Sequence, residues 1–393
     1  MPIYLDCAAT TPIDPRVRDI VVRYMDADFG NSGSRTHDFG VRARRAVERA
    51  RDQVAAVVGA TRGEVVFTSG GTESNNLAIL GLADYGLRGG RKHLVSTAIE
   101  HHAVLEPLRW LEQHGFELTL VGPNRGGWVE PGAIRHAVRD DTLLVSVMHV
   151  NNETGVIQPV SEIAALLAGH RAYFHVDAAQ GYGKELASLR DPRIDLISVS
   201  GHKIHAPKGI GALIARRRHI GQSTGRKAQG ERPPLIPLMH GGGQELGLRP
   251  GTLPVHLIAG LGLAAELAVA EAAPRTEANC RFRDSLLAAL LPLGAVLAAD
   301  PEHTVAHIAN LSFPGIDADD VIEALADIVA ISNGAACTSQ SQTCSHVLSA
   351  MRLKSGQIQG ALRLSWCHMT EDVDWGQVAQ AVGKLRAGHD KVR

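Results

Sequence analysis

Short apolar runs alternate with stretches of helix length along the first two thirds of the chain. An amphipathic helix is expected over residues 73–87, and another begins near His101. Short runs that are apolar on both faces and regularly separated are typical of a mostly parallel sheet covered by helices. The expected strands lie at 65–67, 93–96, 118–121, 143–147, 173–176 and 196–199.

The pattern changes after about residue 255. A long helical stretch over 255–291, expected to break at Pro274, precedes strands at 308–313 and 362–365. The predicted fold class is therefore α/β, with a central mostly parallel sheet flanked by helices, plus a smaller α+β domain. We expect a large domain over 15–255 and a small domain formed by 1–14 and 256–393.

Composition supports a large globular protein with an ordinary surface. The 393 residues include 40 Lys and Arg against 41 Asp and Glu, and 45% are hydrophobic. This balance argues against wholesale disorder and against a broad basic surface for nucleic acid, so no direct nucleic-acid partner is expected. The apolar stretch 255–273 contains His256, Glu266 and Glu271. It therefore predicts a core-facing helix rather than a membrane span.

Cysteine usage indicates a reducing compartment. The five cysteines are an odd number and form no CxxC pair, which argues against a disulfide framework. The first residues, MPIYLD, lack the basic and apolar regions of a signal peptide. A cytoplasmic location is the expectation. A polar, Gly-rich segment at 221–234 is expected to be a surface loop.

Three segments carry candidate chemistry. Lys203 follows the strand 196–199 and can form a Schiff base with a carbonyl cofactor, although an isolated lysine is more often a solvated one. Asp177 ends a buried strand, where it could hold the proton of a pyridine nitrogen or simply cap a helix. The small residues of 68–76 open a helix and could cradle a phosphate, or only form a cap and a tight turn.

Together these parts make a pyridoxal 5'-phosphate site, and here the sequence closely resembles the cysteine desulfurases among fold-type I pyridoxal-phosphate enzymes. Nine ordered stretches across almost the whole chain carry the resemblance. They are LDCAATTP (5–12), FTSGGTESNN (67–76), EH (100–101), HVNNETG (149–155), HVDAAQ (175–180), SGHKIHAPKGIG (200–211), the block 240–255 ending RPGTLPV, GAACTS (334–339) and LRLS (362–365).

The resemblance implies a role for each matching residue. Lys203 holds the cofactor covalently, His101 stacks on its ring and transfers protons, and Asp177 pairs with the ring nitrogen. The other implied contacts are Gln180 to the phenolic oxygen, Asn152 to substrate and ring oxygen, Gly71, Thr72, Ser200 and His202 to the phosphate, Thr252 to the phosphate of the partner subunit, and Arg363 to the substrate carboxylate.

Cys337 is the nucleophile that the resemblance implies. Its surroundings, 333–343, are small and polar without apolar periodicity, which predicts a mobile loop around a reactive thiol. Cys344, seven residues on, is expected at a helix start with a structural role, although secondary receipt of sulfur stays open. Cys280 is expected to be inert and buried. Without the resemblance, Arg363 would be interpreted as a surface arginine on a strand.

The implied reaction converts L-cysteine to L-alanine and leaves a persulfide on Cys337, whose terminal sulfur passes to an acceptor protein. A homodimer without membrane attachment or metal is implied. FGNSGSR, APKGIGALIARRR and GGGQELGLRPGTLPV most resemble the branch that supplies sulfur for DNA phosphorothioate modification. The alternative within the same family is a desulfurase that supplies sulfur for iron–sulfur clusters and tRNA thiolation.

Three other classes of function compete with this one. Another lyase or aminotransferase of the same fold would share Lys203 and Asp177 but would not need Cys337. A carrier or scaffold protein would not need the set of Lys203, Asp177 and His101. A metal hydrolase built on His202 and His205 lacks any HExxH or paired-cysteine spacing.

Overall fold

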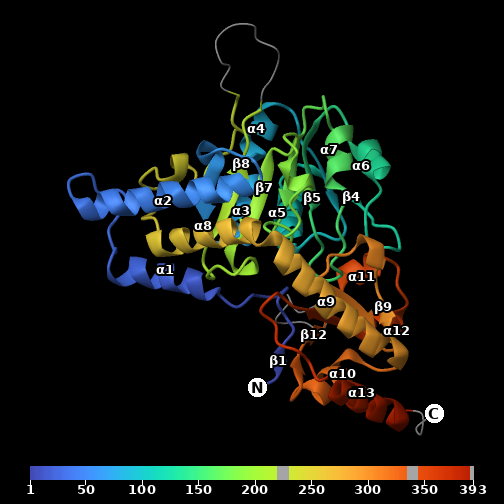
Figure 1. Ribbon diagram of the computed structural model, residues 1–393. Coiled ribbons are helices and arrows are strands. Elements are labelled where there is room, and N and C mark those ends of the chain that lie inside the picture. The colour runs from blue at the N-terminus through green and yellow to red at the C-terminus, as the bar shows by residue number, and fades with distance from the viewer. Residues whose placement is uncertain (219–229, 334–343, 390–393) are drawn as a thin grey trace.

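A seven-stranded sheet forms the centre of the molecule (Figure 1). The computed structural model describes residues 1–218, 230–333 and 344–389. The strand order is β2-β8-β7-β6-β5-β3-β4, and only β8 runs antiparallel to its neighbours. The strands are β2 (Val65–Thr68), β3 (His93–Thr97), β4 (Glu117–Val121), β5 (Thr142–Met148), β6 (Tyr173–Asp177), β7 (Leu196–Ser200) and β8 (Gly211–Ala215). The six expected strands are confirmed within one or two residues, and β8 was missed.

Helices cover both faces of this sheet. Alternate residues of β5 point to opposite sides: Val145 and Val147 join one core, while Leu144 joins the other. One face is covered by α2 (Asp38–Val57), α6 (Pro131–Ala137), α7 (Val160–Leu166) and α8 (Val255–Ala270), with α1 (Pro15–Asp26) packed beyond α8. The other is covered by α3 (Gly71–Leu80), α4 (Ala83–Arg88) and α5 (His102–Gln113). This confirms the predicted α/β class.

The helix expected over 73–87 is two helices, α3 and α4. The break follows Gly81, where a Cβ atom would lie 3.2 Å from the carbonyl oxygen of Ile236. Ile236 N donates to the Gly81 oxygen over 2.9 Å, so a distant segment occupies the space beside this turn. A local pattern of residues cannot show a contact with such a distant segment, so the break between the two helices was not predicted.

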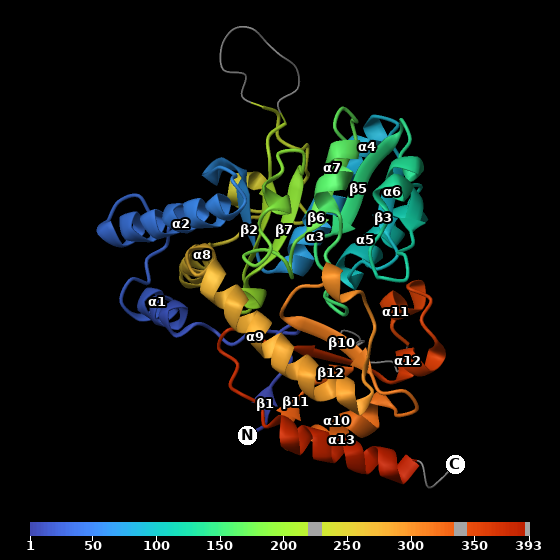
Figure 2. The same ribbon diagram turned by 45° about the vertical axis from the view of Figure 1, so that its right-hand side comes forward.

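A second region lies below the large sheet (Figure 2). It holds the antiparallel sheet β12-β13-β10-β9, and the N-terminal strand β1 pairs with β11. These strands are β1 (Ile3–Tyr4), β9 (Val296–Leu297), β10 (Ile308–Ser312), β11 (Val329–Ala330), β12 (Ser332–Asn333) and β13 (Ala361–Ser365). The helices are α9 (Ala272–Leu290), α10 (Ala318–Leu325), α11 (His346–Ala350), α12 (Ser355–Gln359) and α13 (Trp375–His389).

The long helical stretch breaks at Glu271, between α8 and α9, not at Pro274. Pro274 lies in the first turn of α9, where its missing N–H is not needed. Ile258 and Leu261 of α8 belong to the core beneath the large sheet, whereas Leu286 of α9 belongs to the second region. We therefore propose the domain division at this break rather than at residue 255.

Within the described ranges, no single helix is both long and apolar enough to cross a membrane. Only α8 and the stretch that begins with α9 meet the length and composition limits together, as a pair bent by 75°. Most of α8 is buried in the core, as expected for a core-facing helix.

Candidate active site

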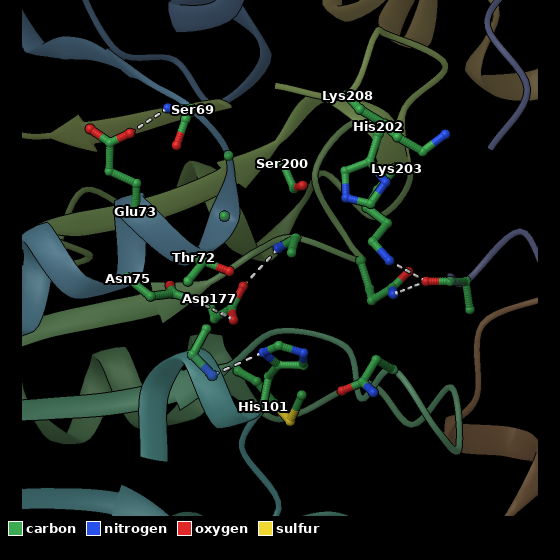
Figure 3. Close-up of a pocket in the computed structure, with 18 of the residues that line it drawn as sticks. Ser69, Thr72, Glu73, Asn75, His101, Asp177, Ser200, His202, Lys203 and Lys208 are labelled. Atoms are coloured by element: carbon green, nitrogen blue, oxygen red, sulfur yellow. Dashed lines mark hydrogen bonds between the residues drawn. The ribbon is translucent and has the colours of Figure 1, made fainter. Parts of the chain in front are cut away.

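The carboxyl ends of the parallel strands meet around a cavity of about 480 Å³ (Figure 3). The turns after β2, β3, β5, β6 and β7 all contribute to it, which is where α/β folds place their ligands. Nine residues singled out from the sequence line this one cavity: Gly71, Thr72, His101, Asn152, Asp177, Gln180, Ser200, His202 and Lys203.

Lys203 ends a short 3-10 turn, η3 (Gly201–Lys203), directly after β7. Its Nζ donates to the backbone oxygen of Ala8 and, over 2.8 Å, to that of Ala9. These carbonyls belong to the N-terminal segment that leads from β1, so residues about 195 positions apart in sequence hold the lysine in place. Lys203 is thus anchored inside the cavity and is not a solvated surface lysine.

Asp177 is buried at the end of β6. Asn75 Nδ2 donates to one carboxylate oxygen over 2.7 Å, and the backbone N–H of Ala179 donates to the other over 3.0 Å. The chain turns after β6 without starting a helix, so the helix-cap interpretation of Asp177 is wrong. The two donors fix a carboxylate that can receive a proton-bearing ring nitrogen.

Gly71, Ser200 and His202 line another part of the cavity. Gly71 begins α3, so free backbone N–H groups and the helix dipole favour an anion there. A Cβ at Gly71 would lie 3.3 Å from Ser200 Cβ, which means that a side chain would crowd this cradle. His202 Nδ1 contacts Thr10 Oγ1 at 3.1 Å, and burial together with nearby Lys203 lowers the His202 pKa to about 4. Neutral His202 can still offer one N–H to a phosphate.

His101 is the N-cap of α5, and its Nδ1 accepts the backbone N–H of Ala103 over 3.0 Å. The hydrogen of the neutral ring is therefore on Nε2. Burial lowers the pKa of His101, although Asp177 opposes this shift. A neutral imidazole can stack on an aromatic ring and exchange a proton.

These groups fit pyridoxal 5'-phosphate. A phosphate requires the N–H and hydroxyl cradle, a pyridine nitrogen requires Asp177, and an aldehyde requires the amine of Lys203. Two buried amide oxygens at the site, Gln180 Oε1 and Asn75 Oδ1, have no partner within the described ranges. Gln180 Nε2 donates to Ala8 O over 2.9 Å and retains a second N–H for a ring oxygen.

Arg363 does not line the cavity. It is 1% exposed on β13, so the surface-strand interpretation is wrong. One terminal nitrogen pairs with Asp6 at 2.7 Å and the other donates to Asn152 O over 3.1 Å, which places Arg363 directly behind Asn152. Its buried Nε has no partner in the described part of the chain and remains available to a carboxylate.

The expected nucleophile, Cys337, lies outside the described residues. Cys344 is exposed, against the expectation of a structural, buried thiol. It precedes Ser345, whose hydroxyl caps α11 by accepting from Leu348 N over 3.0 Å, so Cys344 lies just before the helix. Cys280 is half-buried rather than buried. Thr252 is exposed and does not line its own chain's cavity.

Sequence reasoning missed other contributors to the site. Asn75 and Lys208 lie within quoted motifs, so a signal existed, but their orientation did not follow from it. The carbonyls of Ala8 and Ala9 carry no sequence signal, because any residue has a backbone oxygen. Their position depends on how the N-terminal segment packs against the turn of Lys203.

Comparisons with known proteins agree with this geometry. Residues 3–374 match the model of the family described as aminotransferase class-V. The cysteine desulfurase IscS of Vibrio cholerae is 42% identical, covering 100% of this chain and 94% of that protein. IscS of Escherichia coli is 43% identical, covering 98% of this chain and 94% of that protein.

Two solved structures extend the comparison. DndA from Streptomyces lividans is 50% identical with a TM-score of 0.80, covering 93% of this chain and 99% of that chain. A NifS-like protein is 33% identical with a TM-score of 0.85, covering 98% and 99%.

Proposed function

The chain belongs to the aminotransferase class-V family as a cysteine desulfurase that depends on pyridoxal phosphate, and from that premise we propose that it supplies sulfur for DNA phosphorothioate modification. The observation that carries the proposal is the 50% identity to DndA over 93% of this chain. The relatives named IscS, at 42% and 43% identity, support iron–sulfur supply as the second candidate. Another lyase or aminotransferase is set aside because the full-length relatives are cysteine desulfurases.

We assign the cofactor contacts to the residues gathered in the cavity. Gly71, Thr72, Ser200 and His202 would hold the phosphate, and Asp177 the ring nitrogen. Gln180 and Asn152 would contact the ring oxygen, and His101 would stack on the ring. When bound, pyridoxal phosphate supplies an electron sink for negative charge at the substrate Cα.

Lys203 is assigned two tasks: to link the cofactor covalently and, once substrate has displaced it, to take the Cα proton as a free amine. The carbonyls of Ala8 and Ala9 would position Nζ in its free-amine state, when it acts as a base. Arg363 is assigned to the substrate carboxylate, because its planar guanidinium suits a bidentate contact. Asn152 lies between Arg363 and the cavity, and would share that carboxylate.

Cys337 is assigned as the nucleophile. Its thiolate attacks the sulfur of L-cysteine, a new S–S bond forms, and the substrate C–S bond breaks. The bonding pair stays on carbon, which takes a proton, so the products are L-alanine and a Cys337 persulfide. The terminal sulfur then passes to a thiol of an acceptor protein.

We also propose a homodimer in the cytoplasm, with Thr252 reaching the partner's phosphate. Large apolar side chains are exposed in the segment that carries Thr252, at Met239 and Leu246, and on or beside α1 and α2, at Met25, Phe29 and Phe39. The rings of Phe29 and Phe39 lie 5.3 Å apart, and Arg51 of α2 pairs with Glu245 at 2.6 Å, which joins α2 to this segment. Exposed apolar side chains of this size suit contact with a second copy of the chain.

Deleting the gene in its source strain tests the pathway. The DNA is digested, phosphorothioate dinucleotides are measured by mass spectrometry, and iron–sulfur enzyme activities are assayed in the same cells. Loss of phosphorothioate, restored by the wild-type gene but not by Cys337→Ser, supports the proposal. Normal phosphorothioate with lost iron–sulfur activity or tRNA thiolation would establish the second candidate instead.

A further inference from the structure

A second, much smaller cavity lies behind the turn of Lys203. Its volume is about 40 Å³, enough for an ion or a water molecule and too small for an organic cofactor. It lies between the turn after η3, helix α9 and the segment that follows β13. His205 enters from the first of these, and Cys367 with His368 from the last.

These three side chains form a set of metal-binding groups. One potential ligand atom from each of His205, Cys367 and His368 lies within 4.8 Å of the others. In a tetrahedral zinc site, bond lengths of about 2.0–2.3 Å put ligand atoms roughly 3.3–3.8 Å apart. Small shifts of the three side chains would therefore bring their ligand atoms to the distances that zinc requires. A thiolate with two imidazoles favours zinc over magnesium or calcium, which prefer oxygen.

His205 is already oriented as a ligand. Its Nδ1 lies 3.1 Å from the carbonyl oxygen of Pro12, and a carbonyl can only accept. Nδ1 therefore carries the hydrogen and Nε2 keeps a free lone pair, which is the usual arrangement of a metal-bound histidine. The backbone of His205 is left-handed, with φ of 69°, so the surrounding structure holds the residue in an uncommon conformation.

The other two groups also have polar neighbours. Carboxylate oxygens of Asp14 and Glu271 lie within 4.8 Å of a nitrogen of His368, so a shift of the ring would let one of them accept its N–H. Cys367 Sγ accepts a hydrogen bond from Thr370 Oγ1 at 3.8 Å. Each proposed ligand thus has a neighbour that would orient it.

Two unsatisfied polar atoms belong to residues that line the same cavity. His307 Nε2 and Asn279 Oδ1 are buried and have no hydrogen-bond partner within the described ranges. Buried polar groups rarely remain unpaired, so their state calls for an occupant that the protein itself does not provide. A water molecule bound to a metal could bond to both.

The surrounding charges do not prevent a cation from binding. Lys184 and Arg275 line the cavity, but Arg275 pairs with Glu271 at 2.8 Å and with Asp14 at 3.6 Å. Glu185 lines it as well. Arg16 pairs with the same two carboxylates, Asp14 and Glu271. The carboxylates of Asp14, Glu185 and Glu271 thus offset the three basic side chains, and the Cys367 sulfur adds a negative charge when it loses its hydrogen to bind the metal.

We propose that His205, Cys367 and His368 bind one zinc ion, with a water molecule as the fourth ligand. Binding replaces the thiol hydrogen of Cys367 by a Zn–S bond and releases that proton to solvent. The ion would tie the C-terminal end of β13 to a residue two positions after Lys203. Its role would be to fix the turn of Lys203 against the second region, and its presence can be measured without any activity assay.

Metal titration of the holoenzyme tests the site. The protein is freed of metal with a chelator and titrated with zinc against a chromophoric competitor, and with cobalt while the visible d–d bands are followed. Cys337→Ser and Cys344→Ser are both present throughout, so that neither thiol can bind metal. We expect one tight equivalent per chain, tetrahedral cobalt bands, and release of about one proton per ion.

Variants localise the site. Cys367→Ser and His368→Gln should each weaken zinc binding by more than about 100-fold, and Thr370→Val by about 10-fold through the outer partner. Cys280→Ser, a half-buried thiol on α9, is the matched control and should bind as its parent does. Circular dichroism checks folding, and His368→Gln, at a partly exposed position, decides the outcome if Cys367→Ser fails to fold.

Two results would overturn the proposal. The absence of a stoichiometric equivalent would mean that the cavity holds only water. Equal affinity in His368→Gln and its parent would mean that the metal binds elsewhere on the chain.

Discussion

At the scale of single residues, two lysines share the main cavity but differ in their surroundings. Lys203 donates to the Ala8 and Ala9 carbonyls, whereas Lys208 lines the same cavity from an exposed position. Backbone oxygens position this amine whenever it is free, that is, before it links to a cofactor and after substrate displaces it. A flexible surface lysine does not have that constraint, so the two residues form a natural pair for comparison.

Lys203→Ala should therefore remove the covalent cofactor link, while Lys208→Ala should keep it. The measurement is the intact mass after borohydride reduction, which makes the link permanent. Loss of the cofactor mass in Lys203→Ala alone is expected. A reducible link that persists in Lys203→Ala would assign the role to another lysine.

The two thiols of the expected catalytic segment can be separated in the same way. Cys337→Ser should abolish alanine formation from cysteine but retain cofactor colour, because only the nucleophile is lost. Cys344→Ser should keep most of the first-turnover activity. Single-turnover alanine release with persulfide mapping by mass spectrometry distinguishes them, and the reverse pattern would identify Cys344 as the nucleophile.

Residue types were easier to predict than residue contacts. Asp177 and Lys203 were evident from their places after short apolar strands. Arg363 was expected at a substrate carboxylate, but its pairing with Asp6 joins residues 357 positions apart. Burial of that arginine depends on how β13 packs beside the N-terminal segment, which no local pattern contains.

At the scale of elements, Glu100 joins the ends of two neighbouring strands. One carboxyl oxygen accepts from Thr97 Oγ1 at 2.7 Å and from the backbone N–H of Met148, in β5, at 2.8 Å. Burial raises the pKa of Glu100 from 4.5 to about 8. Between these pH values the folded protein holds a proton that the unfolded chain releases, so this group's contribution to stability falls as pH rises.

Glu100→Gln should remove that dependence. Relative to wild type, the variant should gain stability as pH rises from 5 to 8, by at most about 1.4 kcal/mol per pH unit. Urea unfolding at several pH values measures the difference. Glu106→Gln, at an exposed position on α5, should leave the wild-type pH dependence unchanged, and parallel curves for Glu100→Gln and wild type would contradict the shift.

Two glycines inside helices should respond oppositely to alanine. A Cβ at Gly262 of α8 would lie 2.6 Å from Ala50 Cα of α2, whereas a Cβ at Gly383 of α13 meets nothing within 4 Å. Gly262→Ala should destabilise the protein by about 1–3 kcal/mol through overpacking. Gly383→Ala should stabilise it by about 0.5–1 kcal/mol. Thermal unfolding of both variants measures these changes in stability. Equal shifts of the unfolding temperature in the two variants would contradict close packing of α2 on α8.

Elements were predictable wherever the cause was local. The six expected strands follow from apolar runs, and the class follows from their alternation with helices. The break after Gly81 was not predicted, because it results from a contact with a distant segment. Strand β8 was not predicted either, although its sequence GALIA is a short apolar run like the other six.

At the scale of the whole molecule, the active site draws on segments that are remote in sequence. The N-terminal segment holds Lys203 and Gln180, and Arg363 arrives from the second region through Asn152. The chain order of the motifs was visible in the sequence, but their convergence on one cavity required the fold. The segment 240–254 does not join this convergence, because Thr252 is exposed and lies outside its own chain's cavity.

A shared active site follows if Thr252 acts on the partner subunit. Lys203→Ala and Thr252→Ala homodimers should both be weakly active or inactive, because each site of either dimer carries one defect. When equal amounts are unfolded together and refolded, about half of the dimers are hybrids, and one of their two sites is intact if Thr252 acts in trans. Activity should then recover to about one quarter of wild type, whereas Thr252 acting within its own chain would give no recovery.

Mixing each variant with itself is the control for this experiment, and sedimentation establishes the dimer. An active monomer, or a mixture no more active than its components, would show that each chain completes its own site.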